Sequence, residues 1–292
     1  MKYDLDLFLA LNEEYRSKPL VTAPPAYDPE ALAQRAARRA EIINSRVRVE
    51  RKRILEIGCG RGEVCVALNN VYGCQVVGVD VSRYSNWDDV PSGVTLIQTD
   101  LTEDNPPDIG QFDLIYSNSV WEHVRHPYTM LRRAYDILVP SGHFLLSANL
   151  YRGPKASHRY REIFFPWPHL LFSDEVIDEY YRHLGTPPAG ETWISEDSVE
   201  PSYREQERWG SAWVNQLSIA DYFNYFKLVG YDVEHVKYSI TPLDEEFLAR
   251  FADKLDRFPR YDLERDFLHV KLRKPDQLEN APRTDVKSRR AR

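Results

Sequence analysis

The chain has 292 residues, of which 42% are hydrophobic, and a formal net charge of −7. This is enough chain to bury a core of enzyme size, as one large domain or as a domain with a substantial insertion. The acidic balance disfavours nucleic acid as the main partner, and no apolar run approaches the roughly 18 residues of a membrane span. Acidic residues interrupt the stretch where the core of a signal peptide would lie, so we expect a cytoplasmic protein.

The first part of the chain, residues 1–50, is predicted to be an N-terminal helical element. From Pro29 onward, apolar residues recur at helical spacing, with arginines on the other face of the helix. This pattern predicts an amphipathic helix that packs against the core. The apolar positions are Leu32, Ala36, Ala40, Ile43 and Val47.

Short apolar runs then alternate with helical patterns. Continuous apolar strands that alternate with helices are typical of a parallel sheet covered on both faces. The sequence therefore predicts an α/β fold. The strands are expected at 53–57, 75–80, 94–98, 112–117 and 143–149, and the helices between them at 63–72 and 126–138.

The alternation breaks at residues 151–214, which contain many aromatic, arginine and histidine residues but no clear strand. Long loops inside a compact domain are usually functional, so we interpret this segment as a lid-like insertion. The pattern then returns, with a helix at 218–230, a strand at 231–240, an acidic helix at 244–255 and a strand at 266–274. We expect residues 275–292 to be a basic, disordered tail; contact with a phosphate or a membrane surface is the alternative.

Three glycines, Gly58, Gly60 and Gly62, follow the first strand and enter the next helix. Backbone without side chains can approach a ligand closely at the carboxyl end of a strand, which predicts a cofactor crevice. The third glycine comes one residue earlier than in the dinucleotide pattern, and Glu63 would stand near a pyrophosphate. Glu56, two residues before the first glycine, is placed to act on a cationic ligand instead.

Two acids at strand ends extend this crevice. Asp80 ends the second strand, where a carboxylate can accept from both hydroxyls of a ribose, each bond contributing roughly 1.5–3 kcal/mol. Asp100 follows the third strand and can accept from an exocyclic amine, with Leu101 beside it to pack on a base. An adenosine with a positively charged amino-acid end and no phosphate fits this arrangement.

Together, the glycine turn, the two acids and the stretches YSNSVWEHV and LVPSGHFLL resemble the class I S-adenosylmethionine-dependent methyltransferases. The resemblance implies a Rossmann-like methyltransferase fold at 51–274, with a seven-stranded, mostly parallel sheet, helices on both faces and the lid-like insertion 151–214. The family usually has P-G-G where this chain has Pro140, Ser141 and Gly142, and we expect Gly142 to provide the positive φ of that turn.

The resemblance also implies roles for individual residues. By analogy, the cofactor S-adenosyl-L-methionine contacts four regions of the chain: the methionine end lies at Glu56, Gly58, Gly60 and Gly62, the ribose at Asp80 and Val81, the adenine at Asp100 and Leu101, and the sulfonium near Ser117 and Asn118.

The methyl acceptor determines what further chemistry the site needs. Aligning the acceptor with an activated methyl group can account for about 7–11 kcal/mol of the barrier. A hydroxyl acceptor must also lose a proton, for which a positioned base contributes roughly 10²–10⁴-fold. Glu122 and His123, just beyond the fourth strand, are the candidate catalytic residues; alternatively, this pair only organises its loop.

A metal site is not predicted, although the sequence leaves a divalent metal possible. The three cysteines match no zinc spacing, so we expect free, partly buried thiols. Some related O-methyltransferases hold a divalent metal with an E-x-x-E-H stretch, but Ser119 replaces the first glutamate here. His158 and His169 are the histidines that could supply other ligands.

The insertion provides the candidate substrate contacts His158, Arg159, Trp167 and His169. Aromatic rings can stack on a sugar or another ring, and arginines can pair with phosphate or carboxylate; alternatively, the aromatics close a small core of the insertion. We expect methyl transfer to a small molecule or glycan, at oxygen rather than nitrogen. An RNA or protein methyltransferase and a non-catalytic S-adenosylmethionine-binding partner subunit remain alternatives, and no feature of the sequence predicts the oligomeric state.

Overall fold

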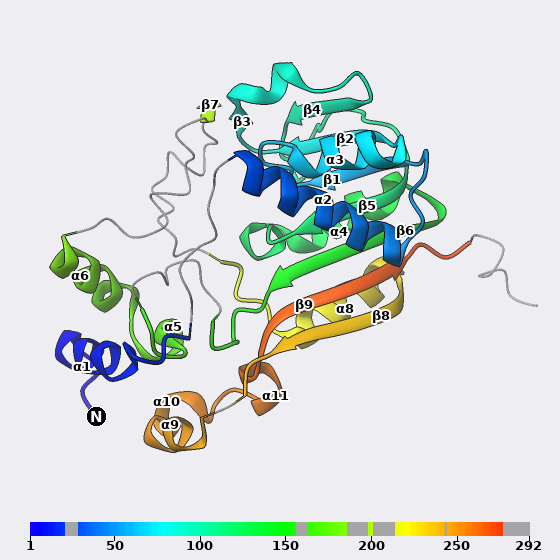
Figure 1. The fold of residues 1–292 in the computed structure, drawn as a ribbon. Helices are drawn as coiled ribbons and strands as arrows, with labels where there is room; N and C mark the ends of the chain where they lie inside the picture. The colour runs from blue at the N-terminus through cyan, green and yellow to red at the C-terminus, as the bar shows by residue number, and fades with distance from the viewer. Residues whose placement is uncertain (21–28, 156–162, 186–197, 201–213, 243, 277–292) are drawn as a thin grey trace, which may run out of the picture.

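The computed structural model describes residues 1–20, 29–155, 163–185, 198–200, 214–242 and 244–276. Within them, seven strands form one sheet (Figure 1). Their order across the sheet is β4 (Val94–Gln98), β2 (Gln75–Asp80), β1 (Arg53–Ile57), β5 (Phe112–Asn118), β6 (Leu138–Asn149), β9 (Arg265–Arg273) and β8 (Asp232–Ile240). Two short strands, β3 (Arg83–Tyr84) and β7 (Ser198–Glu200), pair separately.

The sheet is mostly parallel. Strands β4, β2, β1, β5 and β6 run in one direction, and β9 is antiparallel to both β6 and β8. The strand order reverses at β1, with β2 on one side and β5 on the other. Ligands of open α/β sheets bind at such a switch point, outside the carboxyl ends of the strands. The predicted Rossmann-like α/β fold is confirmed.

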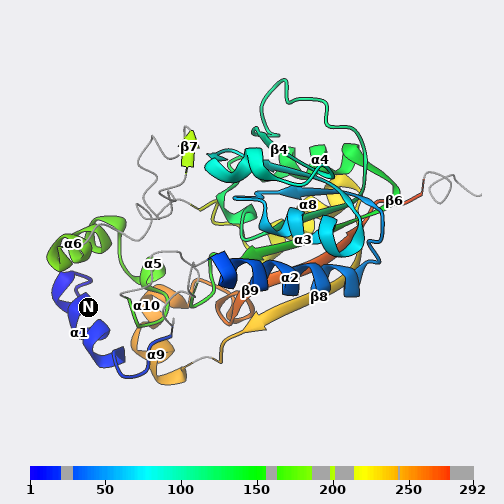
Figure 2. The same cartoon turned by 45° about the horizontal axis from the view of Figure 1, so that its top comes forward.

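Helices cover both faces of the sheet, as the continuous apolar strands require (Figure 2). Within β1, Ile54 packs with α2 (Pro29–Arg46) and α3 (Glu63–Tyr72). Leu55 points to the other face and packs with α4 (Pro127–Ile137) and α8 (Ile219–Val229). A capping box at Ser218 and Asp221 starts α8. None of the helices in the described residues is long and apolar enough to cross a membrane.

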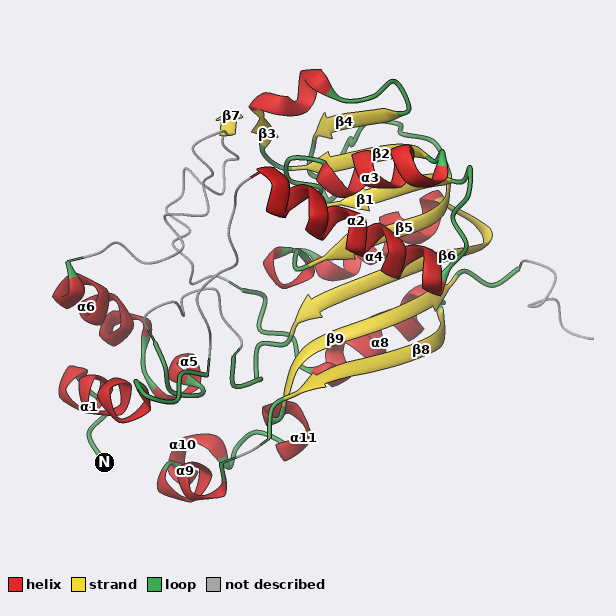
Figure 3. Cartoon of the chain, viewed as in Figure 1, coloured by secondary structure: helices red, strands yellow, loops and turns green. Residues whose placement is uncertain are grey.

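A second core lies beyond the carboxyl end of β6 (Figures 1 and 3). We call the helices around it the cap: α1 (Leu5–Tyr15), α5 (Pro168–Leu171), α6 (Asp174–Leu184), α9 (Glu245–Arg250), α10 (Ala252–Leu255) and α11 (Arg260–Leu263). Phe8 of α1 is fully buried there, with its ring centroid 4.9 Å from Phe172 and 4.6 Å from Tyr180. The cap therefore combines three distant parts of the chain.

The structure corrects three expectations. The segment at 244–255 is two helices rather than one, because Phe251 has the non-helical angles φ −116° and ψ 27°. The insertion contains α5, α6 and the short strand β7. In the turn within β6 the positive φ, 61°, belongs to Ser141 and not to Gly142, where a Cβ would lie 2.8 Å from the carbonyl oxygen of Val139. Gly142 is thus suited to this turn by its lack of a side chain.

Two further predictions concern the cysteines and the C-terminal segment. Cys59, Cys65 and Cys74 are free and buried, which confirms the prediction of free thiols. Residues 277–292, most of the expected tail, lie outside the described part of the chain.

Candidate functional site

The glycine turn after β1 has a left-handed backbone at all three glycines, with φ of 75° at Gly58, 53° at Gly60 and 84° at Gly62. A Cβ at Gly58 would lie 2.1 Å from a methyl group of Val120, and one at Gly62 would lie 2.7 Å from Leu96. A Cβ at Gly60 would meet no atom within 4 Å. Two of the glycines therefore allow close packing, whereas Gly60 faces open space that a ligand can fill.

Asp80, at the carboxyl end of β2, is hydrogen-bonded to this turn. Its Oδ2 accepts from the backbone N–H of Gly60 at 2.8 Å, and its Oδ1 accepts from the N–H of Ser82 at 3.0 Å. The indole N–H of Trp87 donates to the carbonyl of Gly60 at 2.9 Å. The N–H and the carbonyl of Gly60 are therefore both hydrogen-bonded. The half-buried carboxylate of Asp80 retains acceptor capacity for ribose hydroxyls. Val81 follows directly and is also half-buried.

Asp100 and Leu101 follow β4 at the same edge of the sheet. Oδ1 of Asp100 accepts from both the N–H and the hydroxyl of Thr102, at 2.8 and 2.7 Å. Leu101 is only 4% exposed and belongs to the core under α4 and α8. Asp100 thus fixes its own turn at the carboxyl end of β4, and its contact with an adenine stays a prediction.

Glu56, the penultimate residue of β1, is a buried carboxyl with a strongly raised pKa. It is 6% exposed, and the thiol of Cys65 donates to its Oε2 at 3.0 Å. Burial raises its pKa to about 8, although Arg39 on α2 and the bond from Cys65 oppose that shift. A carboxyl held neutral in this way ionises readily when a cation approaches, as the ammonium group of a methionine does.

Ser117 and Asn118 end β5, next to the glycine turn. The hydroxyl of Ser117 is buried and donates to the carbonyl of Ile57 at 3.0 Å, which joins β5 to the last residue of β1. The amide of Asn118 donates to the hydroxyl of Ser119 at 2.9 Å. Ser119 has a φ of 56°, so the chain turns sharply away from the sheet at this residue.

The two candidate catalytic residues lie in the short 3-10 turn that follows, Trp121–His123. Glu122 is 3% exposed, and its Oε1 accepts from the amide of Asn149 at the end of β6. Asn215 donates its backbone N–H to the carbonyl of Glu122 at 2.8 Å and its side-chain amide to that of Trp121 at 2.7 Å. Glu122 therefore connects its own turn to the end of β6 and to the segment before α8. His123 is the more exposed of the pair.

The candidate substrate residues occupy different environments. His158 and Arg159 lie outside the described residues. Trp167 is 1% exposed inside the cap core, and its indole N–H donates to the carbonyl of Arg152 at 3.2 Å. That burial argues against the predicted substrate contact at Trp167 and agrees with the alternative that aromatics of the insertion close a core.

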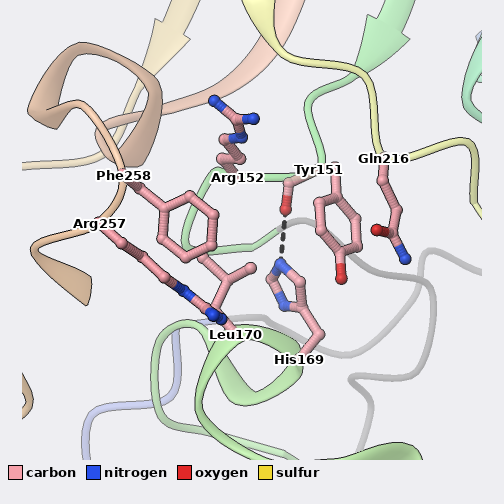
Figure 4. A pocket seen from close by; sticks show the side chains of 7 residues that line it. All are labelled: Tyr151, Arg152, His169, Leu170, Gln216, Arg257 and Phe258. Atoms are coloured by element: carbon pink, nitrogen blue, oxygen red, sulfur yellow. Dashed lines mark hydrogen bonds between the residues drawn. The ribbon is translucent and has the colours of Figure 1, made fainter. Parts of the chain in front are cut away.

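His169 lies at a cavity of about 360 Å³ next to the cap (Figure 4). Its Nε2 bonds to the carbonyl of Tyr151, so this nitrogen carries the proton and donates. The residues that line this cavity are Tyr151, Arg152, His169, Leu170, Gln216, Arg257 and Phe258. The motifs at the strand ends did not predict most of them. Of these residues, His169 was predicted as a substrate contact, and Tyr151 and Arg152 follow a predicted strand.

A metal site is not evident in the described residues, where no three histidine, cysteine, aspartate or glutamate side chains gather in a way that could hold an ion. Ser119, in place of the first glutamate of the E-x-x-E-H stretch, bonds to Asn118 instead.

Comparisons with known proteins agree with this geometry. A family model described as a methyltransferase domain matches residues 26–184, more than half of the chain. The ubiquinone biosynthesis O-methyltransferase of Marinobacter nauticus is 30% identical over 126 residues, which are 40% of this chain and 52% of that protein. The tRNA U34 carboxymethyltransferase of Pseudomonas fluorescens is 26% identical over 189 residues, 59% of this chain and 55% of that protein. The chain thus spans about half the length of these curated relatives.

Among solved structures, an S-adenosylmethionine-dependent methyltransferase from Mesorhizobium loti is similar with a TM-score of 0.47 and 21% identity, over 83% of this chain and 97% of that one. The matched family model covers the glycine turn, both acids and the turn at Glu122. The open glycine, the acid beside it and the buried carboxyl at Glu56 suit an adenosine with a cationic amino-acid end. The chain therefore belongs to the methyltransferase domain family.

Proposed function

We propose that the chain transfers the methyl group of S-adenosylmethionine to an oxygen of a small molecule or glycan. The observation that supports this best is the close approach of Val120 to Gly58, where a Cβ would come within 2.1 Å of a Val120 methyl group. The turn that carries Glu122 and His123 is therefore packed directly against the glycine turn. A base in this position lies beside the cofactor crevice.

The residues of the chain have separable tasks in this proposal. The bound cofactor supplies an activated methyl group. Glu56 balances the ammonium group, Asp80 accepts from the ribose, and Asp100 and Leu101 hold the adenine. His123 takes the proton of the acceptor hydroxyl, and Glu122 positions it by holding the turn to Asn149 and to the backbone of Asn215.

The comparisons support oxygen as the acceptor atom. The relatives from Marinobacter nauticus and Pseudomonas aeruginosa are both described as ubiquinone biosynthesis O-methyltransferases, and each aligns over about 40% of this chain. An oxygen acceptor also gives a role to a base at the edge of the crevice, which a neutral amine acceptor does not need.

A second candidate is transfer to RNA. The observation in its favour is the tRNA carboxymethyltransferase relative, whose alignment covers more of this chain, 59%, than the O-methyltransferase alignments do. The net charge of −7 opposes this alternative, because RNA binding requires phosphate contacts from basic surface. The third alternative, a non-catalytic binder, predicts cofactor binding without turnover.

The first experiment measures thermal shifts with S-adenosylmethionine, S-adenosylhomocysteine and NAD, each alone. A ligand at 100 times its dissociation constant stabilises the folded state by about 2.7 kcal/mol, so binding is readily detected. We expect shifts with the two adenosyl ligands only, and a smaller shift for Asp80→Asn. A shift with NAD alone would exclude the assignment.

The second experiment measures release of S-adenosylhomocysteine with panels of phenols, sugars, amines and tRNA. We expect turnover with hydroxylated small molecules, and a loss of roughly 10²–10⁴-fold in kcat for His123→Gln with cofactor binding retained. Turnover with tRNA alone supports the second candidate. A His123→Gln variant as active as wild type would show that another residue is the base.

A further inference from the structure

The cavity beside the cap has the size and position of an acceptor site. Its volume of about 360 Å³ lies within the range of roughly 300–1,000 Å³ typical of ligand pockets. Its walls come from the segment after β6, from α5, from the segment before α8 and from Arg257 and Phe258 between α10 and α11 (Figure 4).

Two of these walls continue directly from the segments that hold the candidate catalytic turn. Tyr151 lies two residues after Asn149, whose amide bonds to Glu122. Gln216 follows Asn215, which bonds to the backbone of Trp121 and Glu122. The cavity is thus anchored to the same turn that packs against Gly58, at the carboxyl edge of the sheet.

The lining is positively charged. Arg152 and Arg257 lie against the same ring, with their guanidinium carbons 5.4 and 4.7 Å from the centroid of Phe258, and Figure 4 shows that ring between them. None of the lining residues is acidic. The chain as a whole has a net charge of −7, so two arginines at one small cavity indicate a local preference for anions.

The two arginines are not equivalent. Arg152 lies 2.6 Å from Asp262, whose side chain is 8% exposed, so this charge is already balanced. Arg257 makes no ion pair with any residue in the described part of the chain, and its guanidinium is held by stacking on Phe258. A planar guanidinium that is oriented but not neutralised is suited to accept a carboxylate or a phosphate in a bidentate pair.

The remaining walls suit the body of an aromatic or other planar acceptor. Tyr151 and His169 are packed edge to face with ring centroids 4.8 Å apart, and Phe258 and Leu170 add apolar surface. Such a lining combines apolar contact with a few polar groups that fix the orientation of a ligand.

We infer that this cavity binds an acceptor that carries an anionic group, a carboxylate or a phosphate, which pairs with Arg257. This inference rests on the proposed function for the acceptor's role, but the binding of the anion can be measured without turnover. Arg257 then selects anionic over neutral acceptors, and Arg152, held by Asp262, supports the ring of Phe258 on its other side.

The test uses three probes of similar size: benzoate, phenyl phosphate and benzamide, which is the neutral match of benzoate. Their binding to the full chain is measured by calorimetry at low salt, with and without S-adenosylhomocysteine. The variant is Arg257→Gln. The control is Arg48→Gln, which removes an exposed arginine that likewise makes no ion pair in the described residues.

We expect one of the two anions to bind at least about ten times more tightly than benzamide, and Arg257→Gln to weaken it by roughly 10- to 100-fold. Binding should also weaken as salt is added, because the pair is partly exposed. Arg48→Gln should change nothing. The tighter of the two anions identifies the class, carboxylate or phosphate.

Equal binding of benzoate and benzamide, anion binding that survives Arg257→Gln, or no anion binding at millimolar concentration would each overturn the inference. Loss of the proposed function gives a different result. If S-adenosylhomocysteine does not bind but the anion still binds through Arg257, the anion site stands and the proposed methyl transfer from S-adenosylmethionine falls.

Discussion

Glu56 shows how one buried carboxyl can link ligand binding to stability. Its pKa is raised from the ordinary value of 4.5 to about 8, mainly because burial disfavours its charged form. In the unfolded chain this group ionises near its ordinary pKa, whereas in the folded chain it keeps its proton until about pH 8. Between these values the folded state binds more protons, so its stability falls as pH rises.

Replacing this carboxyl with an uncharged amide should remove that pH dependence. We expect the free energy of unfolding of the wild type to fall relative to that of Glu56→Gln between pH 5 and pH 8, by at most about 1.4 kcal/mol per pH unit. Urea unfolding at pH 5, 6.5 and 8 measures the difference. Glu179→Gln, an exposed carboxyl on α6, serves as control. Parallel curves for the wild type and Glu56→Gln would contradict the shift.

At the scale of residues, the sequence predicted side chains whose positions are set by local structure. Asp80 lies at the end of β2 as expected, because the apolar period locates the end of a strand. The environment of Trp167 was not predictable. Its burial depends on Phe247 of α9, whose ring centroid is 5.9 Å away and whose place is set by packing between distant segments.

At the scale of elements, the glycine turn combines packing with access. Gly58 allows the turn at Val120 to approach the end of β1, whereas Gly60 faces open space. The two positions share a left-handed backbone, so alanine is strained at both. Gly58 and Gly60 differ only in their surroundings. Alanine substitution at each position can therefore separate the effect on packing from the effect on ligand access.

We expect Gly58→Ala to lower stability more than Gly60→Ala. At Gly60 the cost is that of the left-handed backbone, about 1–2 kcal/mol. At Gly58 a contact of 2.1 Å with Val120 adds overpacking, which typically costs a further 1–3 kcal/mol or so. Urea unfolding measures both.

Cofactor affinity provides the second measurement for this pair. Gly60→Ala should weaken S-adenosylhomocysteine binding more than its small effect on stability implies, because its methyl group enters the open space. If both variants bind the cofactor as well as the wild type does, the crevice lies elsewhere.

The sequence located most elements of the sheet because their apolar runs are short and bounded by polar turns. The bounds of β1, β2, β4 and α3 agree with those predicted. The break at Phe251 was missed because the sequence there continues a helical pattern, whereas its ring is fully buried in the cap and packs at a tilt against Phe247, with centroids 4.6 Å apart. Tertiary packing overrode the local propensity.

At the scale of the whole molecule, the cap and the sheet have separate cores. Phe8 is fully buried in the cap, and none of the residues in its core belongs to the core around the glycine turn. The wall of the proposed anion site formed by His169 and Leu170 belongs to α5 of the cap, whereas Glu56 and Asp80 lie on the sheet.

We therefore expect Phe8→Ala to affect the two binding activities differently. Replacing a buried phenylalanine with alanine lowers the free energy of unfolding by about 3–5 kcal/mol. At Phe8 this loss destabilises the cap. Benzoate or phenyl phosphate binding should fall sharply, while S-adenosylhomocysteine binding, measured by calorimetry at 10 °C or so to keep the sheet folded, should persist. Glu13→Ala, on the exposed face of α1, is the control. Equal loss of both ligands would indicate that cap and sheet unfold as one unit.

Strand β9 lies between β6 and β8 but follows both along the chain. During synthesis, β6 is complete long before β9 leaves the ribosome. One edge of β6 therefore stays unpaired while the insertion and α8 are made. Unpaired edges invite pairing with other chains, and charged side chains discourage it. Asp232, Glu234 and Lys237 on β8 provide such charges. A chain that ends before Arg265 would therefore leave one edge of β6 and both edges of β8 unpaired, which exposes it to pairing with other chains.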